Sequence, residues 1–307
     1  MISIGIVGAG IVGERIIKQI QQENGVEIAI VYDETAERLE ALKEVYGVPI
    51  ANSFEEVLHA DINWIYIGTP PATHSDIAER AASAGIHVLS EKPLAHNAED
   101  GERMVKTVKE NQVQSAMHFP LMYSPAVREM AGRIKNGSIG DILRIELQTY
   151  FPEWPRPWQQ NPWIASRSQG GFIREVFPHY LQLIHRLFGD LTILSHRITY
   201  PEQADKCETG LIAHGRTVND IPVLLTGLSG SGQKELLQFV VYGKEGVLTL
   251  ENWSVLLESK SGQERQQITE FEMVPTLFEE MKGQSTFLVS FEEGLIIQRL
   301  IDQLLVD

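Results

Sequence analysis

Short apolar runs alternate with longer amphipathic stretches through the first third of the chain. The runs are rich in Ile and Val, as in Ile28-Ala29-Ile30-Val31, and strands that are apolar throughout are typical of sheets covered on both faces. The pattern predicts strands at Ser3–Val7, Glu27–Tyr32, Trp64–Ile67, Ile86–Leu89 and Gln114–Met117. Helical spacing of apolar residues predicts helices at Ile11–Gln22, Thr35–Val45, His74–Ala84 and Ala98–Glu110. This alternation predicts βαβ units in a doubly wound parallel sheet of the Rossmann type.

The pattern changes after about residue 118. Strand-like runs follow one another with polar turns between them, which favours an antiparallel sheet. We expect strands at Ile142–Tyr150, Leu191–Thr199, Glu208–His214, Pro222–Leu228, Leu236–Tyr242, Val247–Leu250 and Ser254–Glu258. We expect helices at Ser124–Lys135, Phe172–Leu187 and Phe287–Leu305, and a loop rich in Trp and Pro at Phe151–Gln169.

These patterns predict two domains. Residues 1–118 would form the Rossmann-type domain, and residues 119–307 a separate α+β domain. The second sheet would be open and mainly antiparallel, and it is wide enough to need cover on its other face. A partner subunit could supply that cover, so the hypothesis is a homodimer or homotetramer formed through the C-terminal sheet.

Composition narrows the class of protein further. The 307 residues carry a formal net charge of −15, which argues against nucleic acid or an anionic membrane as a partner. Cys207 is the only cysteine, so no intrachain disulfide can form, and a reducing compartment fits. The first residues lack a basic leader, and no apolar run approaches the ~20 residues of a membrane helix. We therefore expect a cytoplasmic protein, and the net charge does not argue against a small-molecule substrate.

A glycine motif follows the first expected strand. Gly8-Ala9-Gly10-Ile11-Val12-Gly13 reads G-x-G-x-x-G and opens the first expected helix, which is the context that dinucleotide binding requires. Gly8 would permit the tight turn, Gly10 the approach of a pyrophosphate, and Gly13 close packing of helix on strand. The helix N-terminus would offer its free N–H groups to the phosphates.

Asp33 supports a nicotinamide dinucleotide as the ligand. It ends the second expected strand, 20 residues after Gly13, where a carboxylate can accept hydrogen bonds from the adenosine ribose. A carboxylate would repel a 2′-phosphate, and Glu34 and Thr35 supply no cation, so NAD is favoured over NADP. The alternative is an acidic residue that merely precedes the helix beginning near Thr35.

Two further segments give the sequence a family resemblance. Gly68-Thr69-Pro70-Pro71-Ala72-Thr73-His74 carries T-P-x-x-x-H, and Ser90-Glu91-Lys92-Pro93-Leu94-Ala95 carries E-K-P. With the glycine motif, their order and spacing resemble the Gfo/Idh/MocA family, which contains glucose–fructose oxidoreductases and inositol dehydrogenases. The two-domain layout matches over the whole chain, and the match is strongest in the Rossmann third.

Lys92 is the residue to which the resemblance gives the central catalytic role. Oxidising a secondary alcohol removes a hydride and a proton, and a cation beside the oxygen stabilises the developing alkoxide. Lys92 lies just beyond an expected strand, at the sheet edge where doubly wound folds bind ligands. The resemblance implies that Lys92 contacts the nicotinamide ribose and the substrate, that Glu91 lies near the cofactor, and that the Lys92–Pro93 bond is cis. The alternative for a Lys-Pro pair is a surface turn.

Thr69, Pro70 and His74 are implied by the resemblance to line the cofactor cleft. They follow the strand expected at Trp64–Ile67, and Pro70-Pro71 makes a rigid loop. His74 opens a helix, so it could instead hold the loop in place without touching the cofactor.

The rest of the site is expected from the segment that begins at Gly170-Gly171. The family has a glycine run, an aspartate and then a histidine four residues on, and here Glu175 and His179 keep that spacing. The i, i+4 spacing would place both on one helix face, with His179 as acid–base partner of Lys92 and Glu175 orienting it or touching a substrate hydroxyl. Glu replaces the usual Asp, and Pro178 could bend the helix at His179. The alternative is a Glu–His pair that braces a helix. Glu175 and His179 could also suggest a metal site, but no third His, Cys or Asp follows at the spacing of a metal ligand, so we expect no metal.

Substrate contacts are expected to differ from those of the family. Leu121 and Met122 stand where relatives often have an arginine pair. Trp163, close to the glycine pair, is the candidate substrate contact, because a tryptophan face packs on sugar C–H groups. Trp154 and Trp158 could equally pack their own loop.

The sequence thus predicts an NAD-dependent dehydrogenase that acts on a secondary alcohol or carbonyl of a sugar, inositol or related polyol, with Lys92, Glu175 and His179 as its catalytic residues. Two alternatives stay open: an enzyme acting on a non-sugar carbonyl or diol, and a non-catalytic NAD-binding sensor or regulator.

Overall fold

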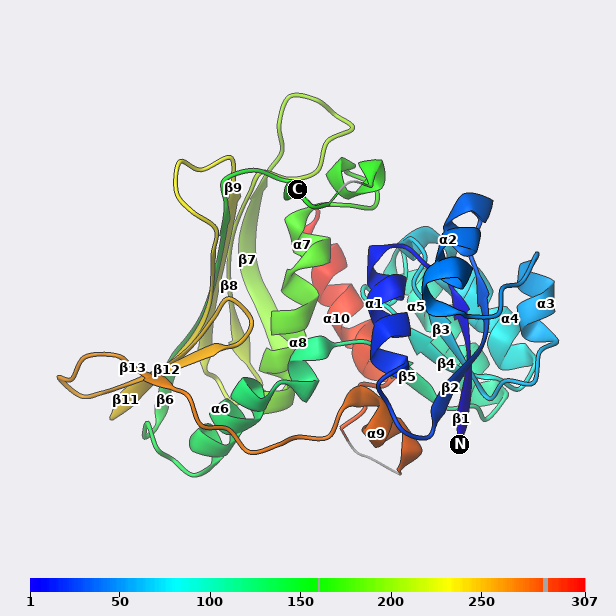
Figure 1. The fold of residues 1–307 in the computed structure, drawn as a ribbon. Coiled ribbons are helices and arrows are strands. Elements are labelled where there is room, and N and C mark those ends of the chain that lie inside the picture. The colour runs from blue at the N-terminus through cyan, green and yellow to red at the C-terminus, as the bar shows by residue number, and fades with distance from the viewer. Residues whose placement is uncertain (160, 284–286, 307) are drawn as a thin grey trace. The chain divides into compact units, whose positions relative to one another are not determined.

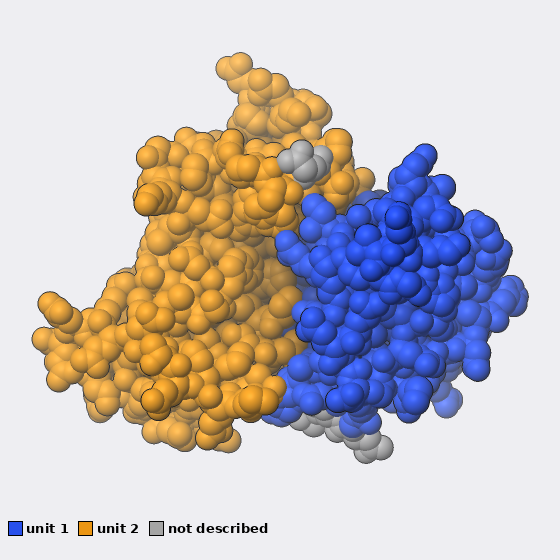
Figure 2. All heavy atoms as spheres, in the orientation of Figure 1, with its two compact units in different colours: residues 1–119, 275–298 blue, residues 120–274, 299–307 orange. Residues whose placement is uncertain are grey.

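The chain folds into two compact units in a computed structural model that describes residues 1–159, 161–283 and 287–306. Unit 1 comprises Met1–Phe119 and Pro275–Gln298, and unit 2 comprises Pro120–Val274 and Arg299–Asp307 (Figure 2). The expected division at residue 118 placed 275–298 in the second domain, whereas these residues belong to unit 1.

Unit 1 is built on a parallel sheet of five strands in the order β2-β1-β3-β4-β5. The strands are β1 (Ile2–Val7), β2 (Val26–Tyr32), β3 (Trp64–Ile67), β4 (His87–Ser90) and β5 (Ser115–Met117). All four residues of β3 are buried, as expected of a strand covered on both faces.

Helices flank both faces of this sheet, with α1 on one side and α3 and α4 on the other (Figure 1). The helical segments of the first 119 residues are α1 (Ile11–Ile20), α2 (Ala36–Tyr46), α3 (Phe54–Leu58), η1 (Pro71–Thr73), α4 (His74–Ser83) and α5 (Ala98–Glu110). Ser53 and Asn97 cap α3 and α5 by accepting a hydrogen bond from a backbone N–H of the first turn.

A distant C-terminal segment completes unit 1. It contains α9 (Leu277–Lys282) and the part of α10 (Phe291–Leu304) up to Gln298. Val289 forms an antiparallel bridge with Met117 of β5, and the Oε1 of Gln298 accepts from the backbone N of Ala95 at 3.4 Å. This segment therefore lies along β5, which is an edge strand of the sheet.

Unit 2 is built on an eight-stranded sheet in the order β13-β12-β11-β10-β6-β9-β8-β7, in which only the pair β6–β9 is parallel. Its strands are β6 (Ile142–Phe151), β7 (Leu191–Thr199), β8 (Gly210–Thr217), β9 (Pro222–Ser229), β10 (Leu236–Gly243), β11 (Gly246–Glu251), β12 (Val255–Lys260) and β13 (Gln266–Ile268). Its helical segments within 120–274 are η2 (Pro120–Tyr123), α6 (Pro125–Lys135), η3 (Pro162–Ala165), α7 (Phe172–Glu175) and α8 (Phe177–Phe188). Helices α7 and α8 lie along one face of the sheet (Figure 1).

The predicted fold class is confirmed: a parallel Rossmann sheet is followed by an open, mainly antiparallel sheet. One expected element is wrong, because the helix expected at Phe172–Leu187 is two helices that meet at Val176. Pro178 lies in the first turn of α8 and has no N–H to donate to the preceding turn, which explains the break. Glu175 and His179 consequently belong to different helices.

Candidate active site

The carboxyl ends of the five parallel strands form one level edge in unit 1. The last residues of the strands pair with one another across the sheet: Tyr32 with Val7, Val7 with Ile67, Ile67 with Ser90, and Ser90 with Met117. The residues that follow them therefore emerge side by side: Asp33, Gly8, Gly68, Glu91 and His118. Ligands of doubly wound sheets bind at this edge.

The three glycines of the motif have different structural roles. Gly8 has φ +87, and a Cβ there would lie 2.6 Å from the backbone of Gly68. A Cβ on Gly13 would collide with the carbonyl oxygen of Gly8, whereas a Cβ on Gly10 would meet nothing within 4 Å. Gly8 and Gly13 are therefore needed for packing, and only Gly10 leaves the open approach that a pyrophosphate requires.

Helix α1 begins directly after this opening. The first hydrogen bond along the helix runs from the backbone N of Glu14 to the oxygen of Gly10, at 2.9 Å. The N–H groups of Ile11, Val12 and Gly13 come before it, so the helix itself gives them no acceptor. Ile11 and Val12 are also exposed, and their N–H groups suit the phosphates of a dinucleotide.

Asp33 lies directly against the glycine loop. Its Oδ2 accepts from the backbone N of Ala9 at 2.7 Å, and its Oδ1 accepts from the backbone N of Thr35 at 2.9 Å. The alternative considered above, an acidic residue that merely precedes α2, accounts only for the second of these contacts. The first holds the carboxylate beside the glycine loop.

Lys92 follows β4 at the same edge and is half-buried. Its backbone N donates to the Oε2 of its neighbour Glu91 at 3.4 Å, and the Lys92–Pro93 peptide bond is cis, as the resemblance implied. Glu91 is buried and receives two further donors: the hydroxyl of Tyr66 lies 2.9 Å from its Oε1, and Nδ1 of His118 lies 2.5 Å from the same oxygen. Three segments thus hold the carboxylate that precedes Lys92.

The charge of Glu91 is set by two opposed effects. Burial alone would raise the pKa of its carboxyl group, but the charge and hydrogen bond of His118, with Lys92 and Tyr66, outweigh burial and lower the pKa to about 2. Glu91 is therefore an anion at neutral pH, next to the lysine that is expected to act on substrate. Burial and this neighbouring anion raise the pKa of Tyr66, which keeps its hydroxyl a donor.

Thr69, Pro70 and His74 follow β3. Pro70 is exposed, whereas His74 is fully buried. Its Nε2 lies 2.9 Å from the oxygen of Thr69, and its Nδ1 lies 3.1 Å from the oxygen of Pro93. Burial lowers the pKa of His74, so the neutral ring donates to one side only. These contacts tie the Thr69 loop to the segment after Lys92, as expected if His74 holds the loop in place.

In unit 2, the glycine pair leads into α7. A Cβ on Gly170 would collide with the carbonyl of Ile164, and Gly171 has φ +99. A Cβ on Gly171 would collide with the carboxylate of Glu208, whose Oε1 accepts from the backbone N of Ile173 at 2.7 Å. The glycine pair therefore makes room for a buried carboxyl group that holds the start of α7, the helix that ends at Glu175.

Glu208 is almost completely buried, with 1% of its surface exposed. Its Oε2 has no hydrogen-bond partner among the described residues. Burial raises the pKa of this carboxyl group to about 7, although the hydrogen bond from Ile173 and the charge of Arg174 act in the other direction.

His179 lies in the first turn of α8 and is buried. Its ring meets the edge of Trp253 at 90°, with 5.1 Å between the ring centroids, and Tyr180 stacks on the same indole at 5.4 Å. Trp253 itself has φ +74 in the turn between β11 and β12. This hairpin therefore fixes the orientation of His179, a role that the sequence did not indicate.

Trp163 begins the turn next to the glycine pair. Its carbonyl accepts from the backbone N of Ser166 at 2.9 Å, and its side chain is half-buried. Trp154 and Trp158 have a different environment. The guanidinium of Arg156 lies 5.4 Å from the Trp154 ring centroid and 5.9 Å from that of Trp158, and it is paired with Glu235. These two tryptophans pack around an arginine, which matches the structural alternative considered for them.

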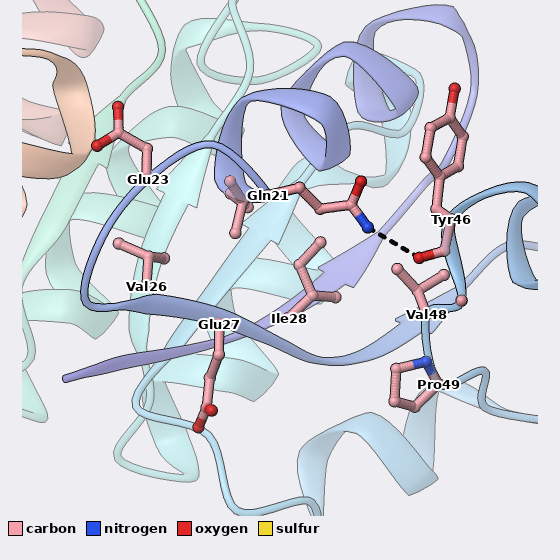
Figure 3. A pocket seen from close by; sticks show the side chains of 10 residues that line it. Gln21, Glu23, Val26, Glu27, Ile28, Tyr46, Val48 and Pro49 are labelled. Carbon is pink, nitrogen blue, oxygen red and sulfur yellow. Dashed lines mark hydrogen bonds between the residues drawn. The ribbon is translucent and has the colours of Figure 1, made fainter.

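A surface hollow of about 230 Å³ in unit 1 lies away from this edge (Figure 3). It is lined by the end of α1, the start of β2 and the residues after α2, so it is at the amino ends of the strands. Gln21 donates across it to the oxygen of Tyr46 at 2.8 Å. Because ligands of this fold bind at the carboxyl ends, we do not assign the cofactor to this hollow.

Two features are absent from residues 1–159, 161–283 and 287–306, the part of the chain that the structure describes. No three His, Cys, Asp or Glu side chains there gather as they would around a metal ion. No helix there has the length and apolar character needed to cross a bilayer.

Two family models match the chain in succession. Residues 2–119 match the oxidoreductase family with an NAD-binding Rossmann fold, named for Gfo, Idh and MocA, and residues 127–249 match the C-terminal domain of the same family. The resemblance inferred from the motifs is thereby confirmed.

Characterised and uncharacterised relatives agree with this assignment. An uncharacterised oxidoreductase of Streptococcus pneumoniae is 28% identical over 192 residues, which are 62% of this chain and 51% of that protein. The match therefore spans about half the length of that relative. Inositol 2-dehydrogenase of Rhizobium meliloti is 23% identical over 308 residues, which cover 95% of this chain and 89% of the relative.

Solved structures share the fold over nearly the whole chain. A 3-ketoreductase from Actinomadura kijaniata, in complex with NADP and TDP-benzene, has a TM-score of 0.83 at 18% identity and covers 99% of this chain and 96% of its own. A levoglucosan dehydrogenase in complex with NADH and L-sorbose has a TM-score of 0.82 at 18% identity and covers 99% of this chain and 95% of its own. With its two matching domains, the chain belongs to the Gfo/Idh/MocA family of oxidoreductases, and its first unit is an NAD(P)-binding Rossmann fold.

Proposed function

We propose that the protein is a dehydrogenase that moves a hydride between NAD and a secondary alcohol or carbonyl of a sugar, inositol or related polyol. The observation that carries the proposal is the level row of strand ends in unit 1. It puts the open glycine loop, the loop-bound carboxylate of Asp33 and the segment of Lys92 on one edge of the sheet.

Bound NAD would accept or supply the hydride at this edge. The glycine loop and the start of α1 would hold the pyrophosphate, and Asp33 the adenosine ribose. The ammonium group of Lys92 would stabilise negative charge on the substrate oxygen and relay the proton of the substrate hydroxyl. Glu91, an anion held by Tyr66 and His118, would keep the backbone of Lys92 in place.

Residues of unit 2 carry the remaining proposed roles. We assign His179 the acid–base role and Glu175 the role of orienting it or binding a substrate hydroxyl. The support is that Trp253 fixes the His179 ring and that Glu208 holds the helix ending at Glu175. Trp163 would contact the sugar face, since a tryptophan ring packs well on C–H groups.

The substrate class rests on the relatives. Inositol 2-dehydrogenase and levoglucosan dehydrogenase act on polyhydroxylated rings, and both match this chain. Reduction of a keto sugar is the same chemistry in reverse, and the similarity to a 3-ketoreductase keeps that direction open.

The exposed face of the second sheet supports self-association. Ile212 on β8 is 64% exposed, and Leu194 and Leu228 on the flanking strands are 54% and 46% exposed. Apolar side chains at this spacing on one sheet favour burial against another surface. A second copy of the chain, in a homodimer or homotetramer, would provide it.

Turnover of a substrate panel tests the proposal. NAD reduction would be measured with polyols, aldoses, inositols, sugar acids and amino sugars, for the wild type, Lys92→Ala and the control Lys106→Ala. Lys106 is exposed on α5 and lies outside the proposed site. We expect turnover that falls by about a thousandfold or more in Lys92→Ala, through loss of the cation and the proton relay, and is unchanged in Lys106→Ala. Turnover that survives in Lys92→Ala contradicts the assignment, and tight NAD binding with no turnover on any substrate favours the sensor.

A further inference from the structure

Two opposite charges contact the same residue of the glycine loop. Asp33 Oδ2 accepts from the N of Ala9 at 2.7 Å, and Arg38 Nε donates to the O of Ala9 at 2.8 Å. Arg38 lies on α2, and its Nη2 is also 3.5 Å from the oxygen of Gly10. A carboxylate and a guanidinium thus flank the loop where the adenosine half of a dinucleotide is read.

These two groups favour different cofactors. A carboxylate accepts hydrogen bonds from the ribose hydroxyls of NAD, whereas an arginine accommodates the 2′-phosphate of NADP. A guanidinium binds phosphate strongly because its parallel N–H groups match two phosphate oxygens. Asp33 alone therefore does not decide between NAD and NADP. The preference also depends on whether the guanidinium of Arg38 is available to a 2′-phosphate.

Arg38 is already occupied by an acid. Its Nη2 lies 2.5 Å from the Oε2 of Glu14, in the first turn of α1. The hydroxyl of Tyr46 donates to the other oxygen of Glu14 at 2.6 Å, and Lys18 lies 3.0 Å from that oxygen. Figure 3 shows the Tyr46 hydroxyl pointing away from the surface hollow that its backbone lines.

The Glu14 carboxylate is ionised at neutral pH. The hydrogen bond from Tyr46, followed by those from Arg38 and Lys18, lowers the pKa of Glu14 to about 2. A phosphate that approached Arg38 would have to displace this anion or lie close to it, and either is unfavourable.

We propose that Glu14 is a specificity-determining residue: by holding the guanidinium of Arg38, it withholds that group from a 2′-phosphate and makes the site select NAD over NADP. The inference rests on the proposed use of a nicotinamide dinucleotide and adds the group that discriminates between the two forms. Glu14 acts through Arg38, so it is a positioning residue.

Dinucleotide binding to the intact chain is the direct measurement. Dissociation constants for NAD and NADP would be obtained by titration calorimetry for the wild type and Glu14→Gln. We expect the ratio of NADP to NAD affinity to rise about tenfold or more in Glu14→Gln, as one charge-assisted contact becomes available. Affinity for NAD should change by about twofold or less, since the contacts of Asp33 are kept.

Two controls separate this effect from a general loss of negative charge. Glu37→Gln removes the same charge from the exposed first turn of α2, next to Arg38 in sequence, and should leave the ratio unchanged. The double variant Glu14→Gln with Arg38→Gln should return the ratio of NADP to NAD affinity to the wild-type value. An unchanged ratio in Glu14→Gln, an equal gain in Glu37→Gln, or a gain that persists in the double variant overturns the proposal.

Arg38→Gln alone gives an independent test that needs no change at Glu14. If the guanidinium is held back in the wild type, this variant weakens both cofactors in parallel and leaves their ratio within about twofold. A selective loss of NADP affinity would show that Arg38 already reads the phosphate, and the proposal would be wrong. If the wild type bound neither dinucleotide, the proposed cofactor itself would fail, whereas binding without turnover would count only against the proposed reaction.

Discussion

Glu208 places a titratable group inside unit 2 where its ionisation opposes folding. The carboxyl group is 1% exposed, and burial raises its pKa from 4.5 to about 7. Below pH 4.5 the group is neutral in both the folded and unfolded chain, so it has no effect. Between pH 4.5 and about 7 the unfolded chain loses the proton first, which lowers the free energy of unfolding as the pH rises.

The size of the effect follows from the two pKa values. The gap between 4.5 and about 7 corresponds to about 3 kcal/mol of unfolding free energy, lost in full above pH 7. Glu208→Gln removes the titration and keeps an oxygen that can accept from the backbone N of Ile173. The variant should therefore gain stability relative to the wild type as the pH rises from 5 to 8, by about 2.5 kcal/mol across the interval.

Urea unfolding at several pH values, followed by tryptophan fluorescence, measures this difference. Four of the five tryptophans lie in unit 2, so the signal reports mainly on the unit that contains Glu208. Glu202→Gln, an exposed acid on the same loop, is the matched control and should follow the wild type at every pH. A difference between Glu208→Gln and wild type that stays constant with pH, or shrinks as the pH rises, would refute the reasoning.

Two further predictions concern the glycine loop and the open sheet. Gly10→Ala should keep the wild-type Tm, because its Cβ meets nothing within 4 Å, yet weaken NAD binding about tenfold or more. Gly13→Ala should lower both the Tm and the affinity for NAD, because its Cβ collides with the Gly8 oxygen. Thermal unfolding and calorimetry separate the two outcomes, and equal Tm losses would contradict the assigned roles. Ile212→Asp should convert an oligomer to a monomer in light scattering if the exposed face of the second sheet is the subunit contact; a wild-type chain that is already monomeric would rule that contact out.

The local pattern of the chain predicted most of the fold. The strand at Trp64–Ile67 and the helix at Ala98–Glu110 agree with the prediction, because the first is apolar throughout and the second has apolar residues at helical spacing. The helix at Phe172–Leu187 was too long, since apolar spacing continues through Val176 while the missing N–H of Pro178 interrupts the hydrogen bonds.

Some elements were missed for want of an apolar signal. Strand β13 is short, polar and at the sheet edge, and α3 has only five residues. Helix α9 did carry a readable signal, because Thr276 and Glu279 form a capping box.

The candidate site was predictable only where a motif marks it. Glycine spacing and the E-K-P motif placed Gly8–Gly13 and Lys92 at the sheet edge, but the roles of Glu175 and His179 stay predictions. His118 meets Glu91 from 27 residues away in sequence, and Trp253 meets His179 from 74. Such contacts depend on which strands are neighbours and on how a hairpin turns, and no periodicity in one sequence records them.

The late segment of unit 1 has a consequence for how the chain is made on the ribosome. Residues 1–119 emerge first, but residues 275–298, which add Val289 against β5, emerge only after the whole of 120–274. At about 5–20 residues per second, that delay is on the order of 10–30 s. Throughout it the edge strand β5 stands without its final neighbour, and unpaired edges are where partly made chains associate with one another. Until residues 275–298 emerge, the nascent unit 1 is therefore exposed to association through β5.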